Sequence, residues 1–154
     1  MSLGRLSCTP TGALSPQRRI YRNDDWLFEG WLGAKTPSSE VAPHFLGSLS
    51  ATSDVAELSD ITWAAMWAIS TFGQGTWPRI CLRCDCTSAA GIARPVFNSR
   101  AQPVLAKISE VLWTYVSQRA RAEWVHVKGH SGEPFIDLVD ACADAAIANG
   151  SACY

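Results

Sequence analysis

The fold of this chain is decided by the stretch WVHVKGHSGEP at residues 124–134. Its first four residues, 124–127, are aromatic, β-branched or histidine and predict a strand. The two glycines and the polar residues after them predict a loop. Pro134 then stands at the first turn of a helix that is predicted to continue to about Asn149. A strand, a loop and a closing helix are therefore expected in this part of the chain.

Upstream of this stretch, strand and helix patterns alternate. The apolar run at 80–84 predicts a short buried strand, and the small residues at 87–90 predict the start of a helix. Apolar residues at a spacing of three and four predict a longer helix from about Pro103 to Gln118.

An earlier helix is expected around residues 58–69, because apolar residues recur there at helical spacing. Ser53 or Asp54 is its expected N-cap, since short polar side chains bond the free N–H groups of a first turn. Gly73, together with a glycine and a proline that follow it, should end this helix.

Two further strands are expected before this helix. Residues 26–32 are rich in aromatic side chains and predict one strand, and residues 44–49 predict a second. The serines and prolines at 35–43 predict a loop, so the two strands should form a hairpin. Residues 1–23 contain four arginines and no acid, and they are expected to form a poorly ordered or divergent segment.

The predicted order is hairpin, helix, strand, helices, strand and helix. Strands that are joined through helices run parallel in one sheet. We therefore expect an α/β fold with a mixed central sheet, in which an antiparallel hairpin and parallel strands are flanked by helices. This domain is expected to span residues 24–150.

The composition limits what the chain can be. With 154 residues, of which 47% are hydrophobic and 18% charged, it is typical of one globular domain. The formal net charge of -1 provides no global basic field, so nucleic-acid binding would depend on a local patch. The sequence has no secretory pattern and no apolar stretch long enough to span a bilayer. An intracellular protein with reduced cysteines and no membrane contact is expected.

Three acids border the buried faces of separate elements. Asp85 follows the strand at 80–84, at the carboxyl edge where sheets of this class bind ligands. Glu57 borders the apolar stripe of the helix around 58–69, and Asp140 borders that of the closing helix. These three carboxylates could converge at one end of the sheet.

Such a cluster requires a cation, because carboxylates a few ångströms apart raise one another's pKa. Oxygen ligands of this kind suit Mg²⁺, which retains waters and accepts phosphate oxygens. Two such ions about 3.5–4 Å apart would activate a water and stabilise the leaving oxygen of a phosphodiester. Alternatively, each acid is an exposed residue at a helix face or strand end, with no chemical role.

The stretch at 124–134, followed by Asp140, resembles the last strand, the flexible loop and the final helix of ribonuclease H. The strand that ends before Asp85 resembles the central aspartate strand of that family, and the helix that contains Glu57 resembles its first helix. The similarity covers about residues 44–149. Its specific part is the KGHSG loop with an Asp eight residues after it. The resemblance is strongest to the type I ribonuclease H domains of non-LTR retrotransposons.

The resemblance implies hydrolysis of the RNA strand of RNA–DNA hybrids by two-metal catalysis. Carried over position by position, Glu57, Asp85 and Asp140 would be catalytic residues that bind Mg²⁺ or Mn²⁺, with two ions in a complete site. His130, in the loop, would carry protons or help the product leave, since an imidazole titrates near neutrality. The partner would be an RNA–DNA hybrid or another nucleic acid. The chain itself would be a monomer or part of a longer polyprotein.

The chain departs from the family pattern at two positions. The first strand of the family carries another essential Asp, whereas residues 1–23 contain no acid. Asp24 or Asp25 could substitute as a fourth ligand if residues 19–22 form the first strand. Ile136 stands where the family commonly has an Asn near the substrate. Both departures point to an inactive copy, although the resemblance itself implies an enzyme.

One alternative is a catalytically inactive module that binds hybrid or duplex nucleic acid. Its candidate phosphate contacts are Arg83, Arg94, Arg100 and Lys128, which are equally typical of ordinary surface charge. Another alternative is a remnant of a retrotransposon polyprotein. Such a remnant would fold poorly, because a lost strand leaves backbone groups unpaired.

A zinc protein is a third alternative, because Cys81 and Cys84, and likewise His126 and His130, have ligand-like spacing. Cys81 and Cys84 are an odd number of residues apart on one predicted strand, so they should face opposite sides. Together with Cys86 they are expected to be small buried residues.

Overall fold

A computed structural model describes the chain in several segments. The described residues are 2–3, 18–22, 25–30, 36–37, 39–42, 45–50, 52–75, 77 and 79–128, with single residues at 141, 144, 145 and 148. The helix predicted from Pro134 to about Asn149 lies almost wholly outside them. Asp24, His130 and Asp140 also lie outside the described residues.

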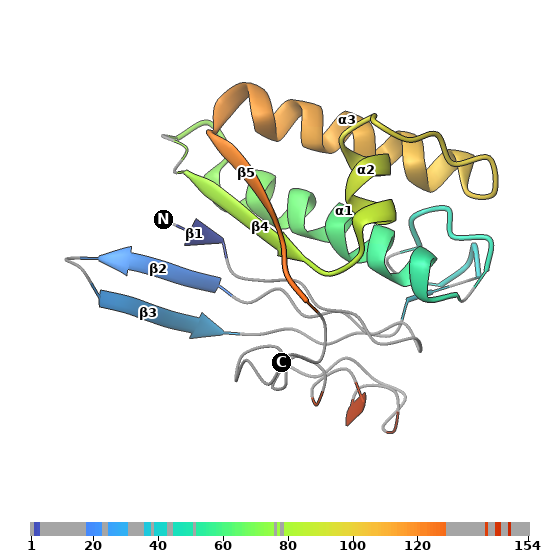
Figure 1. Ribbon diagram of the computed structural model, residues 1–154, viewed down its shortest axis with the longest axis horizontal. Coiled ribbons are helices and arrows are strands. Elements are labelled where there is room, and N and C mark those ends of the chain that lie inside the picture. The colour runs from blue at the N-terminus through green and yellow to red at the C-terminus, as the bar shows by residue number, and fades with distance from the viewer. Residues whose placement is uncertain are drawn as a thin grey trace.

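The central unit consists of two parallel strands and three helices. In chain order these are α1 (Ser53–Phe72), β4 (Ile80–Cys84), α2 (Thr87–Ala93), α3 (Pro103–Arg119) and β5 (Ala122–His126). β4 pairs with β5 along its whole length, from Ile80 opposite Ala122 to Cys84 opposite His126. Figure 1 shows the three helices together on one side of this strand pair. The predicted parallel strands with flanking helices are therefore confirmed.

The start of α1 differs from the prediction by one position. The Ala56 N–H donates to the carbonyl of Thr52 at 3.0 Å, so Thr52 is the N-cap. Ser53 and Asp54, which were the expected caps, already lie within the helix. Gly73 ends the helix as predicted, and its φ of 49° is one that glycine adopts without strain.

Three short antiparallel strands precede the central unit. They are β1 (Ser2–Leu3), β2 (Arg18–Arg22) and β3 (Asp25–Gly30), in the spatial order β1-β2-β3. β1 also lies near β4, and Figure 1 shows the strands of the two sheets side by side. β1 and β2 fall within residues 1–23, and the domain boundary at residue 24 stays a prediction.

The predicted antiparallel hairpin is present, but its partner strand is different. β3 matches the strand expected at 26–32, yet it pairs with β2 rather than with residues 44–49. The strand prediction for 44–49 was wrong, because the described residues 45–49 form no strand. Gly47 has a φ of 88°, which interrupts an extended chain. The Leu49 N–H donates to the side chain of Gln102 at 2.8 Å, so this segment packs as a loop against the start of α3.

The hydrophobic core lies between α1, α3 and the strand pair. Its largest fully buried side chains are Leu58, Ile61, Ile80, Leu82, Leu105, Trp113 and Val116. Trp113 also donates from Nε1 to the carbonyl of Ile61 at 2.8 Å, so its indole ties α3 to α1. None of the helices in the described part of the chain is long and apolar enough to cross a membrane.

Candidate active site

Two of the predicted carboxylates lie at one end of the central unit. Asp85 directly follows β4, and Glu57 lies in the second turn of α1. Figure 1 shows the C-terminal end of β4 and the N-terminal end of α1 on the same side of the molecule. Glu57 is only 7% exposed, a degree of burial that glutamate seldom reaches unless its charge is paired.

The thiol of Cys84 lies at the same end of the fold as these carboxylates. Burial raises the pKa of Cys84, and the negative charges of Glu57 and Asp85 raise it further, to about 12. Cys84 is the last residue of β4, and Asp85 follows it directly. Glu57 and Asp85 are therefore at the end of the fold where β4 ends and α1 begins (Figure 1).

A third acid lies at the same end of the fold. Cys86 is the N-cap of α2, and its Sγ accepts a hydrogen bond from the Ala89 N–H at 3.5 Å. Burial raises the pKa of Cys86, and the charges of Glu57 and Asp54 also raise it. Asp54 lies in the first turn of α1, three residues before Glu57 and on the same face of the helix, so it belongs to this acidic edge. Its position in the sequence predicts only a helix cap.

His126 is a residue that the sequence did not single out for catalysis. Its Nε2 lies 3.2 Å from the carbonyl oxygen of Asp85. The N–H of Val127, the next residue, donates to the carbonyl of Cys84 at 3.0 Å. These contacts hold the end of β5 against the turn that carries Asp85. These contacts depend on the parallel register that sets Cys84 opposite His126. Because that register is a tertiary feature, the sequence pattern could not predict them.

The described carboxylates fit part of a divalent-cation site. Glu57 and Asp85 supply the hard oxygen ligands that Mg²⁺ and Mn²⁺ prefer. The third predicted ligand, Asp140, lies outside the described residues. Within the described segments, no three His, Cys, Asp or Glu side chains are grouped so that they could hold a metal.

The cysteines of β4 do not form a ligand pair. Burial alternates along this strand, with Cys84 buried and Cys81 half-buried, so the two side chains face opposite sides. Cys84 is 3% exposed and fits the expectation of a small buried residue. Cys86 is half-buried at the start of α2.

Among the described strands that precede α1, acids occur on β3, at Asp25 and Glu29. Residues 18–22 form β2, which follows β1 in the described part of the chain, and the substitution by Asp24 or Asp25 as a fourth ligand stays a prediction. Asp25 opens β3 opposite Arg22. Figure 1 shows the end of β2 and the start of β3 away from the C-terminus of β4. β1 consists of Ser2 and Leu3 and contains no acid.

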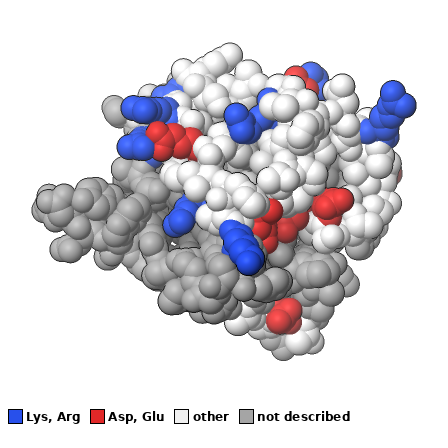
Figure 2. All heavy atoms as spheres, viewed as in Figure 1, with Lys and Arg blue, Asp and Glu red and all other residues white. Residues whose placement is uncertain are grey.

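The predicted cations lie on the elements that surround this edge. Arg83 is half-buried on β4, Arg94 is the exposed C-cap of α2, and Lys128 is exposed after β5. Figure 2 shows acidic side chains gathered near the middle of one face, with basic side chains beside them. Carboxylates flanked by cations could hold a metal and the phosphates of a nucleic-acid strand on one surface.

Neither a protein-family model nor a curated protein matches this sequence.

The fold is that of a ribonuclease H domain, as solved structures show. Ribonuclease H1 from the halophilic archaeon Halobacterium salinarum NRC-1 gives a TM-score of 0.58 at 16% identity, with 95% of this chain and 99% of that chain covered. The solution structure of the PFV ribonuclease H domain gives a TM-score of 0.57 at 14% identity, with 97% and 93% covered. At these identities the likeness concerns the fold, and the α/β architecture expected from the sequence is confirmed.

Proposed function

We propose that this chain binds RNA–DNA hybrids and hydrolyses their RNA strand, as a ribonuclease H-type domain. The observation that carries the proposal is the pair of carboxylates at the C-terminal end of β4, within a ribonuclease H fold. Glu57 is 7% exposed, and the negative charges of Glu57 and Asp85 both raise the pKa of the Cys84 thiol. Two of the solved structures that share the fold are a ribonuclease H1 and a ribonuclease H domain, which supports the same class of reaction here.

In this proposal Glu57, Asp85 and Asp140 hold Mg²⁺ or Mn²⁺, with two ions in a complete site. When bound, the ions supply an activated water and charge compensation at the scissile phosphate. Burial of Glu57 restricts its rotamers and so orients its carboxylate oxygens. The contact of His126 with the backbone of Asp85 steadies the turn that carries this ligand. His130 would exchange protons with the departing strand.

Substrate binding would depend on local cations, because the formal net charge of the chain is -1. Arg83, Arg94 and Lys128 are the proposed contacts to phosphate. They come from β4, from the end of α2 and from the segment after β5, and all three elements border the acidic edge. Contacts of this kind position a strand without reading its sequence.

A second function, binding without cleavage, is favoured by one observation. β1, the first strand, contains no carboxylate, and the whole of residues 1–23 contains none. A site that lacks this ligand would hold fewer ions or none. The chain would then be an inactive nucleic-acid-binding module, or a remnant of a retrotransposon polyprotein.

The test is cleavage of a labelled RNA–DNA hybrid in Mg²⁺ or Mn²⁺ by the parent chain and by its Asp85→Asn and Glu57→Gln variants. We expect the parent to cut the RNA strand and each variant to be slower by at least about 100-fold, the loss typical of removing a group that stabilises transition-state charge. The matched control is Glu110→Gln. Glu110 pairs with Lys107 at 2.8 Å on the surface of α3, so this variant should cut like the parent.

A binding measurement in the presence of a chelator separates the two functions. A folded chain that binds the hybrid and never cuts it would establish the inactive module. Cleavage that survives in both Asp85→Asn and Glu57→Gln would reject the assigned site. A folded chain that neither binds nor cuts the hybrid would reject both functions.

A further inference from the structure

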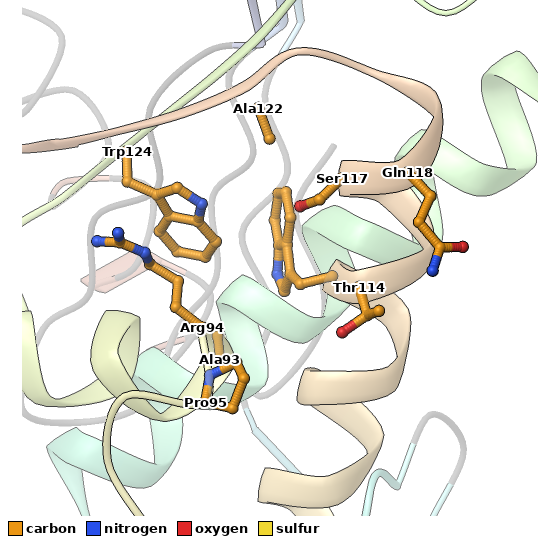
Figure 3. Close-up of a pocket in the computed structure, with 9 residues that line it drawn as sticks. Ala93, Arg94, Pro95, Thr114, Ser117, Gln118, Ala122 and Trp124 are labelled. Atoms are coloured by element: carbon orange, nitrogen blue, oxygen red, sulfur yellow. The ribbon is translucent and has the colours of Figure 1, made fainter.

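A pocket that contains none of the proposed metal ligands opens beside β5. It has a volume of about 410 Å³ and lies between β5, the end of α2 and α3. Figure 3 shows Trp124 and Arg94 on one side of it, and Thr114, Ser117 and Gln118 on the side formed by α3. A volume of this size is within the range of pockets that take small organic ligands.

The aromatic wall of this pocket is held in a fixed position. Trp124 is half-buried, and its ring lies 4.8 Å from the ring of Trp113, centroid to centroid, at an angle of 60°. Trp113 is only 2% exposed and is hydrogen-bonded to the carbonyl of Ile61. Binding of a ligand to Trp124 therefore costs little side-chain conformational entropy, because the ring is already held in place.

The charge of this pocket is positive. The guanidinium carbon of Arg94 lies 5.8 Å from the ring centroid of Trp124, and the side chain is exposed. No Asp or Glu occurs among the described residues that line the pocket. Glu123, the neighbour of Trp124 along β5, pairs with Arg79 and Arg121 instead. Arg94 is therefore placed to bind an anion that lies against the indole.

The pocket continues toward the proposed active site. A second pocket, of about 240 Å³, shares Arg94 and Trp124 with the first one and extends to His126. His126 in turn contacts the backbone of Asp85. The two residues of strand from Trp124 to His126 span roughly 7 Å. That length corresponds to about two nucleotides of a stacked strand.

We propose that the pocket at Trp124 binds one unpaired nucleotide of a nucleic-acid strand. The base takes the place of the Arg94 guanidinium over the indole, and Arg94 pairs with the phosphate of the same nucleotide. The amide and hydroxyl groups of Gln118, Ser117 and Thr114 meet the edge of the base. This inference rests on the proposed function, since it takes the strand to be one that runs on from a hybrid at Asp85. A paired base is already stacked and bonded inside its duplex, so an unpaired one fits this pocket better.

The test compares the affinity of the full chain for two hybrids, measured by fluorescence anisotropy in a chelator so that nothing is cut. One hybrid is blunt, and the other carries a few unpaired nucleotides on one strand. We expect the unpaired nucleotides to raise the affinity about tenfold, which is within the range measured for stacking of one base on an aromatic ring. Ser117→Tyr, which fills the pocket from an exposed position on α3, and Arg94→Gln should both abolish this gain.

The matched control is Arg119→Gln. The guanidinium of Arg119 lies over the ring of Tyr115 at 3.5 Å, but neither of these residues lines either pocket. This variant should keep the tenfold ratio, and circular dichroism checks that each variant is folded. Equal affinity of the parent for both hybrids, or a ratio that survives in Ser117→Tyr, would overturn the inference.

The failure of the proposed function gives a different result. The parent chain could bind a single strand but not the blunt hybrid, and Ser117→Tyr could abolish this binding. That result would support the nucleotide pocket and reject hybrid binding. A parent chain that binds neither of them would overturn the pocket as well.

Discussion

At the scale of single residues, Cys84 connects the core to the acidic edge. Burial together with Glu57 and Asp85 raises its pKa from 9.0 to about 12. A group whose pKa is higher in the folded state stabilises that state at low pH, and this contribution is lost as pH rises toward the folded pKa. We therefore expect the free energy of unfolding to fall between about pH 9 and pH 12, by at most ~1.4 kcal/mol per pH unit from this group. Urea unfolding across this range measures it.

Two variants isolate the thiol from other groups that titrate at high pH. Cys84→Ala removes the titration and some packing, whereas Cys84→Ser removes the titration at nearly constant size. Both variants should lose stability less steeply with pH than the parent, whatever their absolute stability. If the free energy of unfolding of the parent falls no more steeply with pH than that of the two variants, this thiol has an ordinary pKa.

At the scale of elements, the loop after α2 is fastened to the helix at Gly91. The N–H groups of Val96 and Phe97 both donate to the Gly91 carbonyl, at 2.8 and 3.0 Å. A methyl group at Gly91 would lie 2.1 Å from Cδ2 of Phe97. This loop begins at Arg94, so its anchoring helps to place the cation that we assign to nucleic-acid binding.

We expect the effect of Gly91→Ala to depend on Phe97. Within a helix, replacing glycine by alanine ordinarily stabilises by ~1 kcal/mol. In the parent chain the ring of Phe97 must move away, so this gain should be cancelled or reversed. In a Phe97→Ala background the gain should reappear in full. A double-mutant cycle in urea measures the difference, and equal effects in both backgrounds would show that the ring does not lie on Gly91.

At the scale of the whole molecule, a net charge of -1 means that hybrid binding has to come from a few placed cations. Three phosphate contacts, from Arg83, Arg94 and Lys128, predict that the logarithm of the binding constant falls with the logarithm of salt concentration with a slope of roughly -2 to -3. Anisotropy in a chelator at several salt concentrations measures this slope.

Each substitution of one of these three cations by Gln should reduce the magnitude of the slope by about 1. Lys107→Gln is the control, because Lys107 pairs with Glu110 on α3 and is not among the proposed contacts. A slope that all three substitutions leave unchanged would locate the binding surface elsewhere.

The elements that could be predicted from the sequence are those whose pattern is local. The apolar run at 80–84 became β4 with the same bounds, and α3 extends one residue past the helix predicted from Pro103 to Gln118. The placement of Asp85 after a buried strand and of Glu57 beside an apolar stripe also followed from local spacing. Apolar side chains recur every two residues in a half-buried strand and every 3.6 residues in a helix. This periodicity is local, so it predicts an element without knowledge of what the element packs against.

Only the tertiary structure determined which strands pair and which side chains from different elements lie close together. Local pattern alone paired the strand at 26–32 with residues 44–49, but β3 pairs with β2, because strand pairing depends on segments that fold back from elsewhere in the chain. His126 reaches the carbonyl of Asp85 across a separation of 41 residues, through the parallel register of β4 and β5. The pocket at Trp124 likewise needs α2, α3 and β5 together. The sequence by itself determined which side chains were present on each element, whereas packing determined which of them share a surface.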